Sequence, residues 1–296
     1  MLSVKKLREK YLKKELLPTM FCPGCGIGCI LNYSLQAIEK LQIDQNKLVF
    51  VSGIGCSSRL PSYIKAYGLH TTHGRAIAFA TGIKVTNPDL TVIVFTGDGD
   101  CIGIGGNHLI HGIRRNIDIT VIVVNNMNYG MTGGQYSPTT PLNAKVSTAP
   151  MGTIEYPLNL AGLATVAGAP YVARWTIAHP FQCIGAIEKG LMKKGFSFIE
   201  ILSPCPTHYG RWNISRNIKD SLSWLKENTI KSKIYSLRTE LDPFRISYII
   251  GDKITVGEFA YFEKPTFIEQ WKTLTKRMKE EYLVNVSEKG HNKNPD

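Results

Sequence analysis

The sequence predicts an α/β protein built on a doubly wound, mainly parallel sheet. Three observations lead to this prediction. Short apolar runs recur along the first two thirds of the chain, and most are too continuous for half-exposed strands, which is typical of buried parallel strands. Helix-like segments between them are long enough to serve as right-handed crossovers. A glycine-rich turn directly follows one of the runs, where open α/β sheets bind ligands.

The predicted elements alternate in the order that such a sheet requires. The expected strands span residues 48–52, 91–96, 119–124, 171–174 and 198–202. The expected helices span residues 30–41, 74–85, 105–115, 157–167 and 180–194. From about residue 209 onward this alternation stops, so the rest of the chain is expected to lie outside the α/β unit.

We expect three parts in the chain, whose 296 residues suit one large core with appended segments. Residues 1–20 form a basic N-terminal arm, predicted to be a solvated helical face. Residues 21–210 form the α/β domain. Residues 211–296 form a C-terminal extension of mixed charges and scattered aromatic residues, expected to contact a second subunit. A cap over one sheet edge is the simpler alternative for this extension.

Composition narrows the class of protein. Hydrophobic residues make up 43% of the chain and charged residues 20%, which is ordinary for a globular protein. No apolar run approaches the roughly 20 residues that cross a bilayer, and the N-terminus lacks the apolar stretch of a signal peptide, so we expect a cytoplasmic protein without a membrane partner. The net charge of +12 suits several anionic partners, but no aromatic platform for stacking bases accompanies it, so nucleic acid is not expected.

A glycine-rich loop, residues 97–106, follows the expected strand 91–96 and precedes a helix. Glycines let backbone N–H groups approach phosphate oxygens, but Asp98 would repel a bare diphosphate. A Mg²⁺ ion between them removes the conflict, because it binds both carboxylate and phosphate oxygens. The next strand ends in Asn126 and Asn128, which offer an amide oxygen and a main-chain carbonyl. Taken alone, residues 97–106 could be a flexible loop, and the asparagines after the next strand could be an ordinary turn.

Four cysteines flank the expected strands or open the domain. Cys22 and Cys25 form a C-x₂-C pair, Cys56 follows the first strand, and Cys205 follows the last. In a reducing compartment such cysteines indicate metal or redox chemistry rather than disulfides. Four thiolates suit either structural zinc or a [4Fe–4S] cluster, and the split second pair is unlike the usual zinc ribbon.

The motifs in chain order resemble the β subunits of 2-oxoacid:ferredoxin oxidoreductases. They are CPGCG, GIGCSSR, HTTHGRAIAFATGIK, GDGD, NNMNYGMTGGQ and SPCP, and they cover about residues 21–212. The resemblance implies the thiamine diphosphate-binding fold. It also implies thiamine diphosphate, Mg²⁺ and one [4Fe–4S] cluster as cofactors, with partner chains completing the active site.

The resemblance carries roles onto individual residues. The cluster ligands are Cys22, Cys25, Cys56 and Cys205, and the Mg²⁺ ligands are Asp98, Asn126 and the carbonyl of Asn128. The expected coenzyme-binding residues are Ile54, Gly55, Cys56, Ser57, His73, Gly74, Arg75, Gly97, Asp98, Gly99, Asp100, Asn126, Asn128, Tyr129, Gly130, Met131 and Thr132. His73 and Arg59 are the expected catalytic residues, Arg59 through a substrate carboxylate or a partner's acid. Cys29, Cys101 and Cys183 are expected to be small buried hydrophobes, Cys29 being the rival cluster ligand.

The implied function is oxidative decarboxylation of a 2-oxoacid, pyruvate or 2-oxoglutarate. Coenzyme A accepts the acyl group and ferredoxin the electrons. No Glu lies in an obvious motif for activating the coenzyme, so we expect activity only with an α subunit, or α plus γ with or without δ. Two alternatives remain open here: a thiamine-dependent decarboxylase subunit without electron transfer, and a zinc-stabilised basic module that binds nucleic acid.

Overall fold

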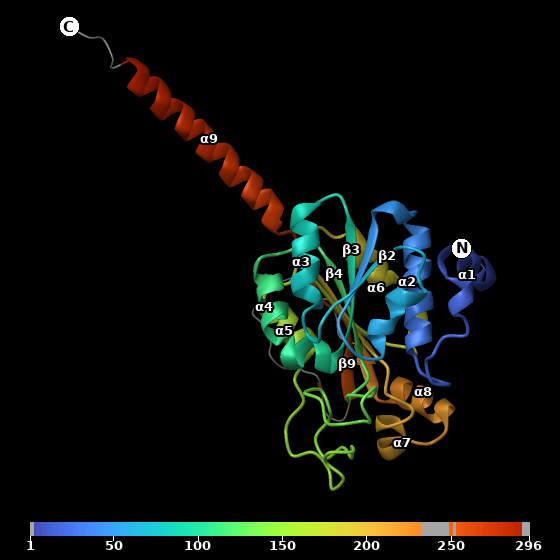
Figure 1. Ribbon diagram of the computed structural model, residues 1–296. Helices are drawn as coiled ribbons and strands as arrows, with labels where there is room; N and C mark the ends of the chain where they lie inside the picture. The colour runs from blue at the N-terminus through green and yellow to red at the C-terminus, as the bar shows by residue number, and fades with distance from the viewer. Residues whose placement is uncertain (1–2, 232–248, 251–252, 292–296) are drawn as a thin grey trace.

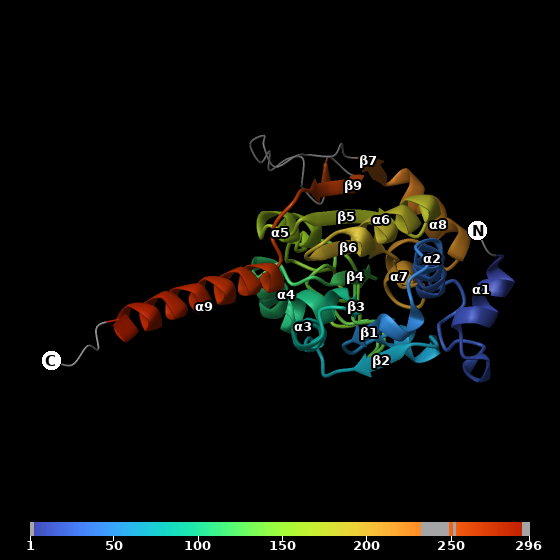
Figure 2. The ribbon, with the colours of Figure 1, turned by 90° about the horizontal axis from the view of Figure 1, so that it is seen from above.

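A three-layer α/β body with a long projecting helix makes up the protein (Figure 1). The computed structural model describes residues 3–231, 249–250 and 253–291. In this part of the chain nine strands form one sheet, with the order β2-β1-β3-β4-β6-β5-β9-β7 and with β8 paired to β9. Figure 2 shows this order as a stack of strands seen from above, with helices on both sides. The predicted fold class is confirmed.

The parallel core of the sheet consists of five strands that the apolar runs predict. They are β1 (Leu48–Ser52), β3 (Thr91–Gly97), β4 (Thr120–Asn125), β5 (Tyr171–Thr176) and β6 (Ser197–Leu202). Nearly every residue in them is buried, because helices cover both faces of the sheet. All five strands therefore end at the same edge of the sheet, which we call the carboxyl edge.

Helices cover the two faces of the sheet. One face carries α3 (Ala76–Thr86), α4 (Gly106–Arg114) and α5 (Leu160–Val166), and the other carries α2 (Ile27–Lys40) and α6 (Pro180–Met192) (Figure 2). The N-terminal arm forms α1 (Val4–Tyr11), which packs on α2 through Leu7 and Tyr11. Short helical turns span Lys14–Leu16, Gln45–Lys47, Ser57–Tyr63 and Gly99–Ile104.

The apolar pattern does not predict the outer strands. β2 (Tyr67–His70) is an edge strand whose residues are all exposed. β9 (Lys253–Tyr261) comes from the C-terminal extension, pairs antiparallel with β5 and is buried along most of its length. β7 (Thr229–Lys231) and β8 (Ile249–Ile250) flank β9. Part of the extension is thus a structural member of the main sheet.

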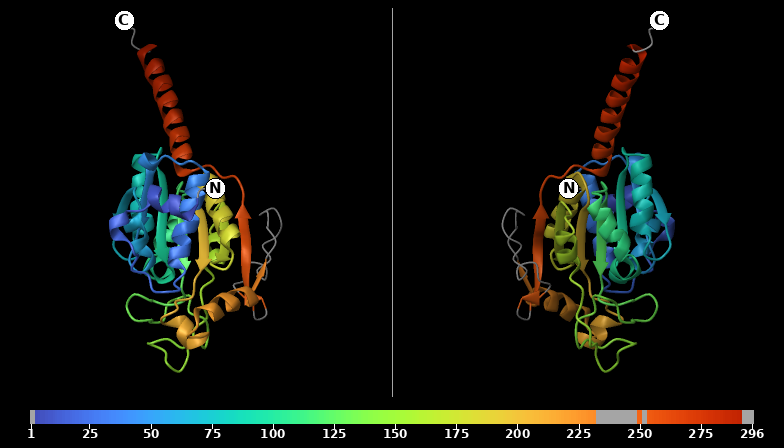
Figure 3. Two further views of the ribbon diagram at one scale, coloured as in Figure 1. Left: turned by 90° about the vertical axis from the view of Figure 1, so that its right-hand side faces the viewer. Right: turned by 90° about the vertical axis from the view of Figure 1, so that its left-hand side faces the viewer.

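The remaining helices lie at opposite ends of the molecule. The short helices α7 (Tyr209–Asn213) and α8 (Ile218–Glu227) lie near the carboxyl edge, beside the long loop between β4 and α5. Helix α9 (Phe267–His291) leaves from the opposite end and extends away from the body (Figure 3). None of the described helices combines the length and apolarity that crossing a membrane requires.

Candidate active site

Two adjoining cavities open at the carboxyl edge of the sheet. The first, of about 200 Å³, is lined by residues that follow β1, β3 and β4. Its lining residues are Ile54, Gly55, Cys56, Ser57, His73, Gly97, Asp98, Gly99, Asp100, Asn126, Asn128, Tyr129, Gly130, Met131 and Thr132. We call it the coenzyme cavity. It brings together fifteen of the seventeen residues that the sequence predicts for the coenzyme.

Gly74 and Arg75 do not line the coenzyme cavity. The Gly74 N–H donates to Asp100 Oδ1 at 2.7 Å, and a Cβ on Gly74 would lie 2.5 Å from Ile104. Arg75 donates to the main-chain oxygens of His73 and Ile104. These two residues instead fasten the start of α3 to the glycine-rich loop, which the sequence does not predict.

Asp98 is buried at the end of β3, where hydroxyl groups from the β4–α5 loop surround it. Its Oδ2 atom accepts hydrogen bonds from Ser137 Oγ at 2.7 Å and Thr139 Oγ1 at 2.5 Å. The Asn126 backbone also hydrogen-bonds this carboxylate, which joins the end of β3 to the turn after β4. Burial raises the pKa of Asp98 to about 6, and these hydrogen bonds oppose the rise. A cation at this carboxylate would favour its charged form.

The predicted metal-binding group of Asn128 is its main-chain carbonyl, which accepts from the Gly130 N–H at 3.1 Å. Its buried side-chain amide has no nitrogen or oxygen partner among the described residues, and it favours the thiolate of the neighbouring Cys205. A Cβ atom on Gly130 would lie 3.4 Å from Asn126 Nδ2 and 3.5 Å from both Asn128 Oδ1 and Cys205 Sγ. The absence of a side chain at Gly130 therefore keeps this junction open. The donor set of one carboxylate and amide or carbonyl oxygens fits Mg²⁺.

Asp100 holds His73 rather than facing the cavity with a free carboxylate. Its Oδ1 atom accepts from His73 Nδ1 at 2.6 Å and from the Ile54 N–H at 3.1 Å, and its Oδ2 atom accepts from Thr96 Oγ1 at 2.6 Å. This bonding fixes the ring through Nδ1 and leaves Nε2 of His73 outside the contact with Asp100. Asp100 thus joins the ends of β1 and β3 to the turn before α3.

The second cavity, of about 100 Å³, contains the predicted cluster ligands. Cys22, Cys25, Cys56 and Cys205 all line it, so the structure brings together these residues from distant parts of the sequence. Burial raises the pKa of Cys25 to about 12 and of Cys56 to about 11, and repulsion among the neighbouring sulfurs adds to both shifts. Bound iron would reverse this, because a cationic centre stabilises thiolates. We call this the cysteine cavity.

The two cavities share a wall. Cys56, Asn126, Gly130 and Met131 line both of them. Arg59 lines only the cysteine cavity, where its side chain is exposed and its charge favours the thiolate of Cys56. A group bound in one cavity would therefore lie directly beside a group bound in the other.

The four cysteines share a cavity lining rather than a preformed single-ion site. Within the described residues no group of three or more His, Cys, Asp or Glu side chains is arranged to hold a single metal ion.

The other three cysteines lie outside the cysteine cavity. Cys101 and Cys183 are buried, as expected for small hydrophobes. Cys29 is exposed on α2, so the expectation of burial is wrong for this residue. Cys29 lies in the first turn of α2, where Ile27 and Ile30 point into the core and Cys29 points to the surface.

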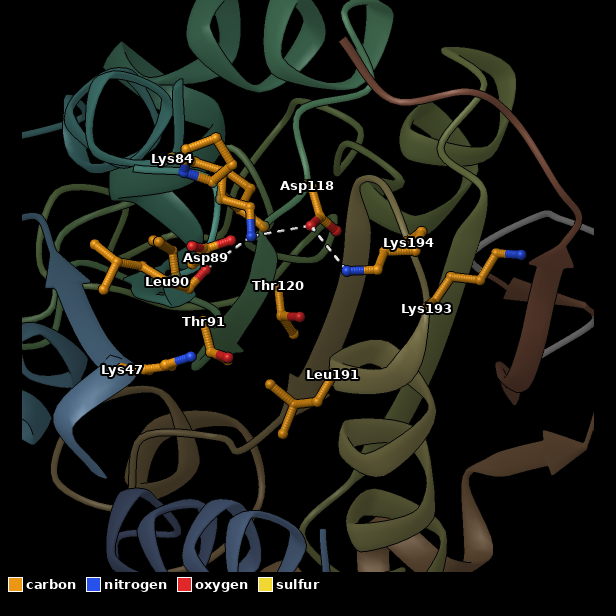
Figure 4. A pocket seen from close by; sticks show the side chains of 13 residues that line it. Lys47, Lys84, Asp89, Leu90, Thr91, Asp118, Thr120, Leu191, Lys193 and Lys194 are labelled. Carbon is orange, nitrogen blue, oxygen red and sulfur yellow. Dashed lines mark hydrogen bonds and ion pairs between the residues drawn. The ribbon is translucent and has the colours of Figure 1, made fainter. Parts of the chain in front are cut away.

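A third cavity, of about 240 Å³, lies at the opposite ends of the strands. Figure 4 shows the charged side chains that line it. Asp118 forms ion pairs with Lys84 at 2.9 Å and with Lys194 at 3.8 Å. The Lys84 ammonium also donates to the Leu90 carbonyl at 2.7 Å. The charges of Asp118 and Lys84 are thus already paired within this cavity. Open α/β sheets bind their ligands at the carboxyl ends of the strands, and this cavity lies at the amino ends. We therefore place the active site at the carboxyl edge.

The chain is similar to known proteins over most of its length. Residues 53–201 match the family model of the thiamine pyrophosphate enzyme, C-terminal TPP binding domain. The chain is 54% identical over 272 residues to a 2-oxoglutarate synthase subunit KorB of Methanocaldococcus jannaschii, covering 92% of this chain and 98% of that relative. It is 47% identical over 257 residues to the 2-oxoacid:ferredoxin oxidoreductase subunit beta of Saccharolobus solfataricus, covering 84% of each chain.

A solved structure supports the same relationship. It is the 2-oxoglutarate:ferredoxin oxidoreductase from Magnetococcus marinus with 2-oxoglutarate, coenzyme A and succinyl-CoA bound, which matches with a TM-score of 0.80 and 34% identity over 92% of this chain and 90% of that chain. The resemblance seen in the sequence motifs is confirmed. The chain belongs to the family of β subunits of 2-oxoacid:ferredoxin oxidoreductases, and it contains the thiamine diphosphate-binding domain of that family.

Proposed function

We propose that this chain carries the coenzyme and the first electron acceptor of a 2-oxoacid:ferredoxin oxidoreductase. A 2-oxoacid, coenzyme A and two oxidised ferredoxins would give an acyl-CoA, CO₂, one proton and two reduced ferredoxins. The shared wall between the coenzyme and cysteine cavities is the observation that carries this proposal. Family membership sets aside the two earlier alternatives, the non-redox decarboxylase and the nucleic-acid module.

Asp98, Asn126 and the carbonyl of Asn128 would hold Mg²⁺, which in turn would hold the diphosphate of the coenzyme. The buried carboxylate of Asp98, whose pKa is raised, supports this assignment. Bound thiamine diphosphate supplies an electron sink for the carbanion left by decarboxylation. The residues of this chain would orient it and keep water from the reacting carbon.

His73 and Arg59 would act on the reactants. His73 lines the coenzyme cavity and keeps Nε2 available while Asp100 binds Nδ1, so it would hold or transfer a proton there. Arg59 would bind a carboxylate of the substrate or of a partner chain near the cysteine cavity.

Cys22, Cys25, Cys56 and Cys205 would bind a [4Fe–4S] cluster, which accepts electrons one at a time. Their convergence on one cavity supports a four-thiolate centre, and membership of a ferredoxin-linked family favours a cluster over zinc. Ferredoxin would then receive the electrons. The net charge of +12 suits an acidic protein partner and the phosphates of coenzyme A.

An α subunit, or α with γ and δ subunits, would complete the site. The carboxylates lining the coenzyme cavity are Asp98 and Asp100, and both are already engaged by hydrogen bonds, so a carboxylate for the pyrimidine ring has to come from elsewhere. The β4–α5 loop beside the cavity exposes Met151, Ile154 and Tyr156 almost fully, at 94%, 89% and 82%. Such a patch is typical of a protein interface. We place the partner there.

We favour 2-oxoglutarate as the substrate, because several relatives are named for it and the solved relative contains it.

Anaerobic copurification with the partner subunits tests the whole proposal. We expect iron, sulfide and thiamine diphosphate in the complex, and ferredoxin reduction that requires both 2-oxoglutarate and coenzyme A. Cys205→Ser should lose iron, whereas the control Cys183→Ser should retain it. Zinc in place of iron, or reduction without a 2-oxoacid, would contradict the proposal.

A further inference from the structure

A buried chain of polar side chains runs through the sheet behind the candidate metal site. Asn125 Nδ2 donates to Glu200 Oε1 at 2.8 Å, and Glu200 Oε2 accepts from Arg174 Nε at 2.7 Å. All three side chains are fully buried and come from the neighbouring strands β4, β6 and β5. An ion pair in such a core is costly to desolvate, and apolar residues often replace one without loss of stability. Its location beside the site therefore points to a role other than stability.

The chain ends at the turn that carries the predicted Mg²⁺ ligands. Asn125 Oδ1 accepts from the Met127 N–H at 3.1 Å, and the Thr139 hydroxyl lies 3.2 Å from the same oxygen. Met127 has a φ of 65°, a left-handed conformation that a methionine rarely adopts. The hydrogen bond from Met127 to Asn125 holds the backbone in this conformation. Residues 126 and 128 lie on either side of Met127, so its conformation contributes to their orientation.

Arg174 is in turn fixed by the C-terminal strand. Its Nη1 atom donates to Thr255 Oγ1 at 3.2 Å and to the Thr255 carbonyl at 3.3 Å, and its Nη2 atom donates to Asn159 Oδ1 at the start of α5. The guanidinium therefore connects β9 and α5 to Glu200. The orientation of the metal-binding turn is thus tied to elements far from it in sequence.

We propose that Glu200 and Arg174 are positioning residues for Mg²⁺ binding: through Asn125 they hold the turn 125–128 so that Asn126 and Asn128 face the metal. This inference rests on the proposed function, in which those residues and Asp98 bind Mg²⁺. A pair that served only to join the strands would leave the affinity for Mg²⁺ unchanged. Loss of partners that orient metal ligands typically weakens binding by about 10- to 100-fold.

The test is a calorimetric Mg²⁺ titration of the complex with its partner subunits, stripped of metal, at a fixed concentration of thiamine diphosphate. Glu200→Gln keeps the shape of the side chain but presents an N–H group to Asn125 or to Arg174. We expect its Mg²⁺ affinity to fall by roughly 10-fold or more. Activity at saturating Mg²⁺ should recover most of the wild-type rate, because the reacting groups remain in place.

Asp118→Asn is the matched control. Asp118 forms an ion pair with the largely buried Lys84 at the other end of the sheet, at 2.9 Å. This variant should bind Mg²⁺ as the wild type does. A second variant, R174M/E200L, removes the buried charges together and should fold, yet it should still bind Mg²⁺ weakly because Asn125 Nδ2 has lost its acceptor.

The outcomes separate the two proposals. Unchanged Mg²⁺ affinity in Glu200→Gln and R174M/E200L would overturn the positioning role and leave the proposed function intact. Equal weakening in Asp118→Asn would also overturn it, since the effect would then follow general destabilisation. Failure of the wild type to bind Mg²⁺ with thiamine diphosphate, or normal binding by Asp98→Asn, would overturn the proposed metal site and this inference with it.

Discussion

Burial of the Asp98 carboxylate lowers the folding stability of the metal-free chain at neutral pH. Its pKa is raised to about 6 in the folded chain, against an ordinary value of 3.8. The folded state therefore binds a proton more tightly than the unfolded chain does. Its stability falls as the pH rises from about 4 to about 6, by about 3 kcal/mol in all for a shift of roughly two pH units.

Asp98→Asn should therefore stabilise the metal-free chain near pH 7, by up to about 3 kcal/mol, and remove much of its loss of stability between pH 4 and pH 6. The same change should abolish Mg²⁺-dependent binding of thiamine diphosphate. Urea unfolding across this pH range, compared with the wild type, measures the first effect. Equal pH dependence of stability in the variant and the wild type would show that burial does not penalise this carboxylate.

The hydrogen bond between His73 and Asp100 leads to a second prediction at this scale. His73→Gln should lower kcat by about 10²-fold or more, the usual contribution of a proton-transferring group, with little change in Mg²⁺ affinity. Steady-state kinetics of the complex with its partners would measure this. A normal kcat would assign His73 to binding or structure instead.

The residues of the site differ in how far the sequence could reveal them. Asp98, Asn126, Cys56 and Cys205 stand in motifs after strands, where a parallel sheet gathers ligands, so their convergence could be predicted. Cys22 and Cys25 form a C-x₂-C pair that opens the domain, before helix α2. Ser137 and Thr139 could not, because nothing in a long loop without regular structure indicates that its hydroxyls fold back onto Asp98. Asn125, Glu200 and Arg174 pair only through the register of three strands.

The strands, too, differ in how well the local sequence predicts them. The five buried parallel strands have continuous apolar runs, and their predicted bounds differ from the observed ones by at most two residues at either end. β2 is exposed on every residue and has no such run. In β9, Gly257 and Glu258 interrupt the apolar pattern, and Glu258 is held in place by Lys189 and Tyr171. Pairing with distant residues, rather than local pattern, makes these two segments strands.

Within the C-terminal extension, helix α9 is the element that we expect to contact a partner subunit. Trp271, Leu274, Met278 and Tyr282 recur at helical spacing along it and are exposed by 42% or more. Removal of residues 271–296 should leave the unfolding temperature within about 3 °C, since exposed residues contribute little. Copurification with the partner subunits should be weakened, with the contact at the β4–α5 loop remaining. A truncated chain that copurifies as fully as the complete chain would place the contact of the extension elsewhere.

For the whole molecule, the positive charge predicts how the enzyme meets its electron acceptor. With a net charge of +12, association with an acidic ferredoxin should be accelerated at low ionic strength. Raising the salt from about 0.05 M to about 0.5 M shortens the screening length and should raise the KM for ferredoxin several-fold, with the KM for the 2-oxoacid less affected. A KM for ferredoxin that is independent of salt would indicate that the basic surface faces another partner.

Two cavities that share a wall lie at one edge of the sheet, and we propose that they hold a Mg²⁺-bound coenzyme directly beside an iron–sulfur cluster. The most direct measurement is a crystal structure of the complex with its partners, with diffraction recorded on both sides of the iron absorption edge. We predict an iron signal among Cys22, Cys25, Cys56 and Cys205, and thiamine diphosphate bound through Mg²⁺ to Asp98 and Asn126. A zinc signal at the cysteines, or a coenzyme bound away from Asp98, would contradict the claim.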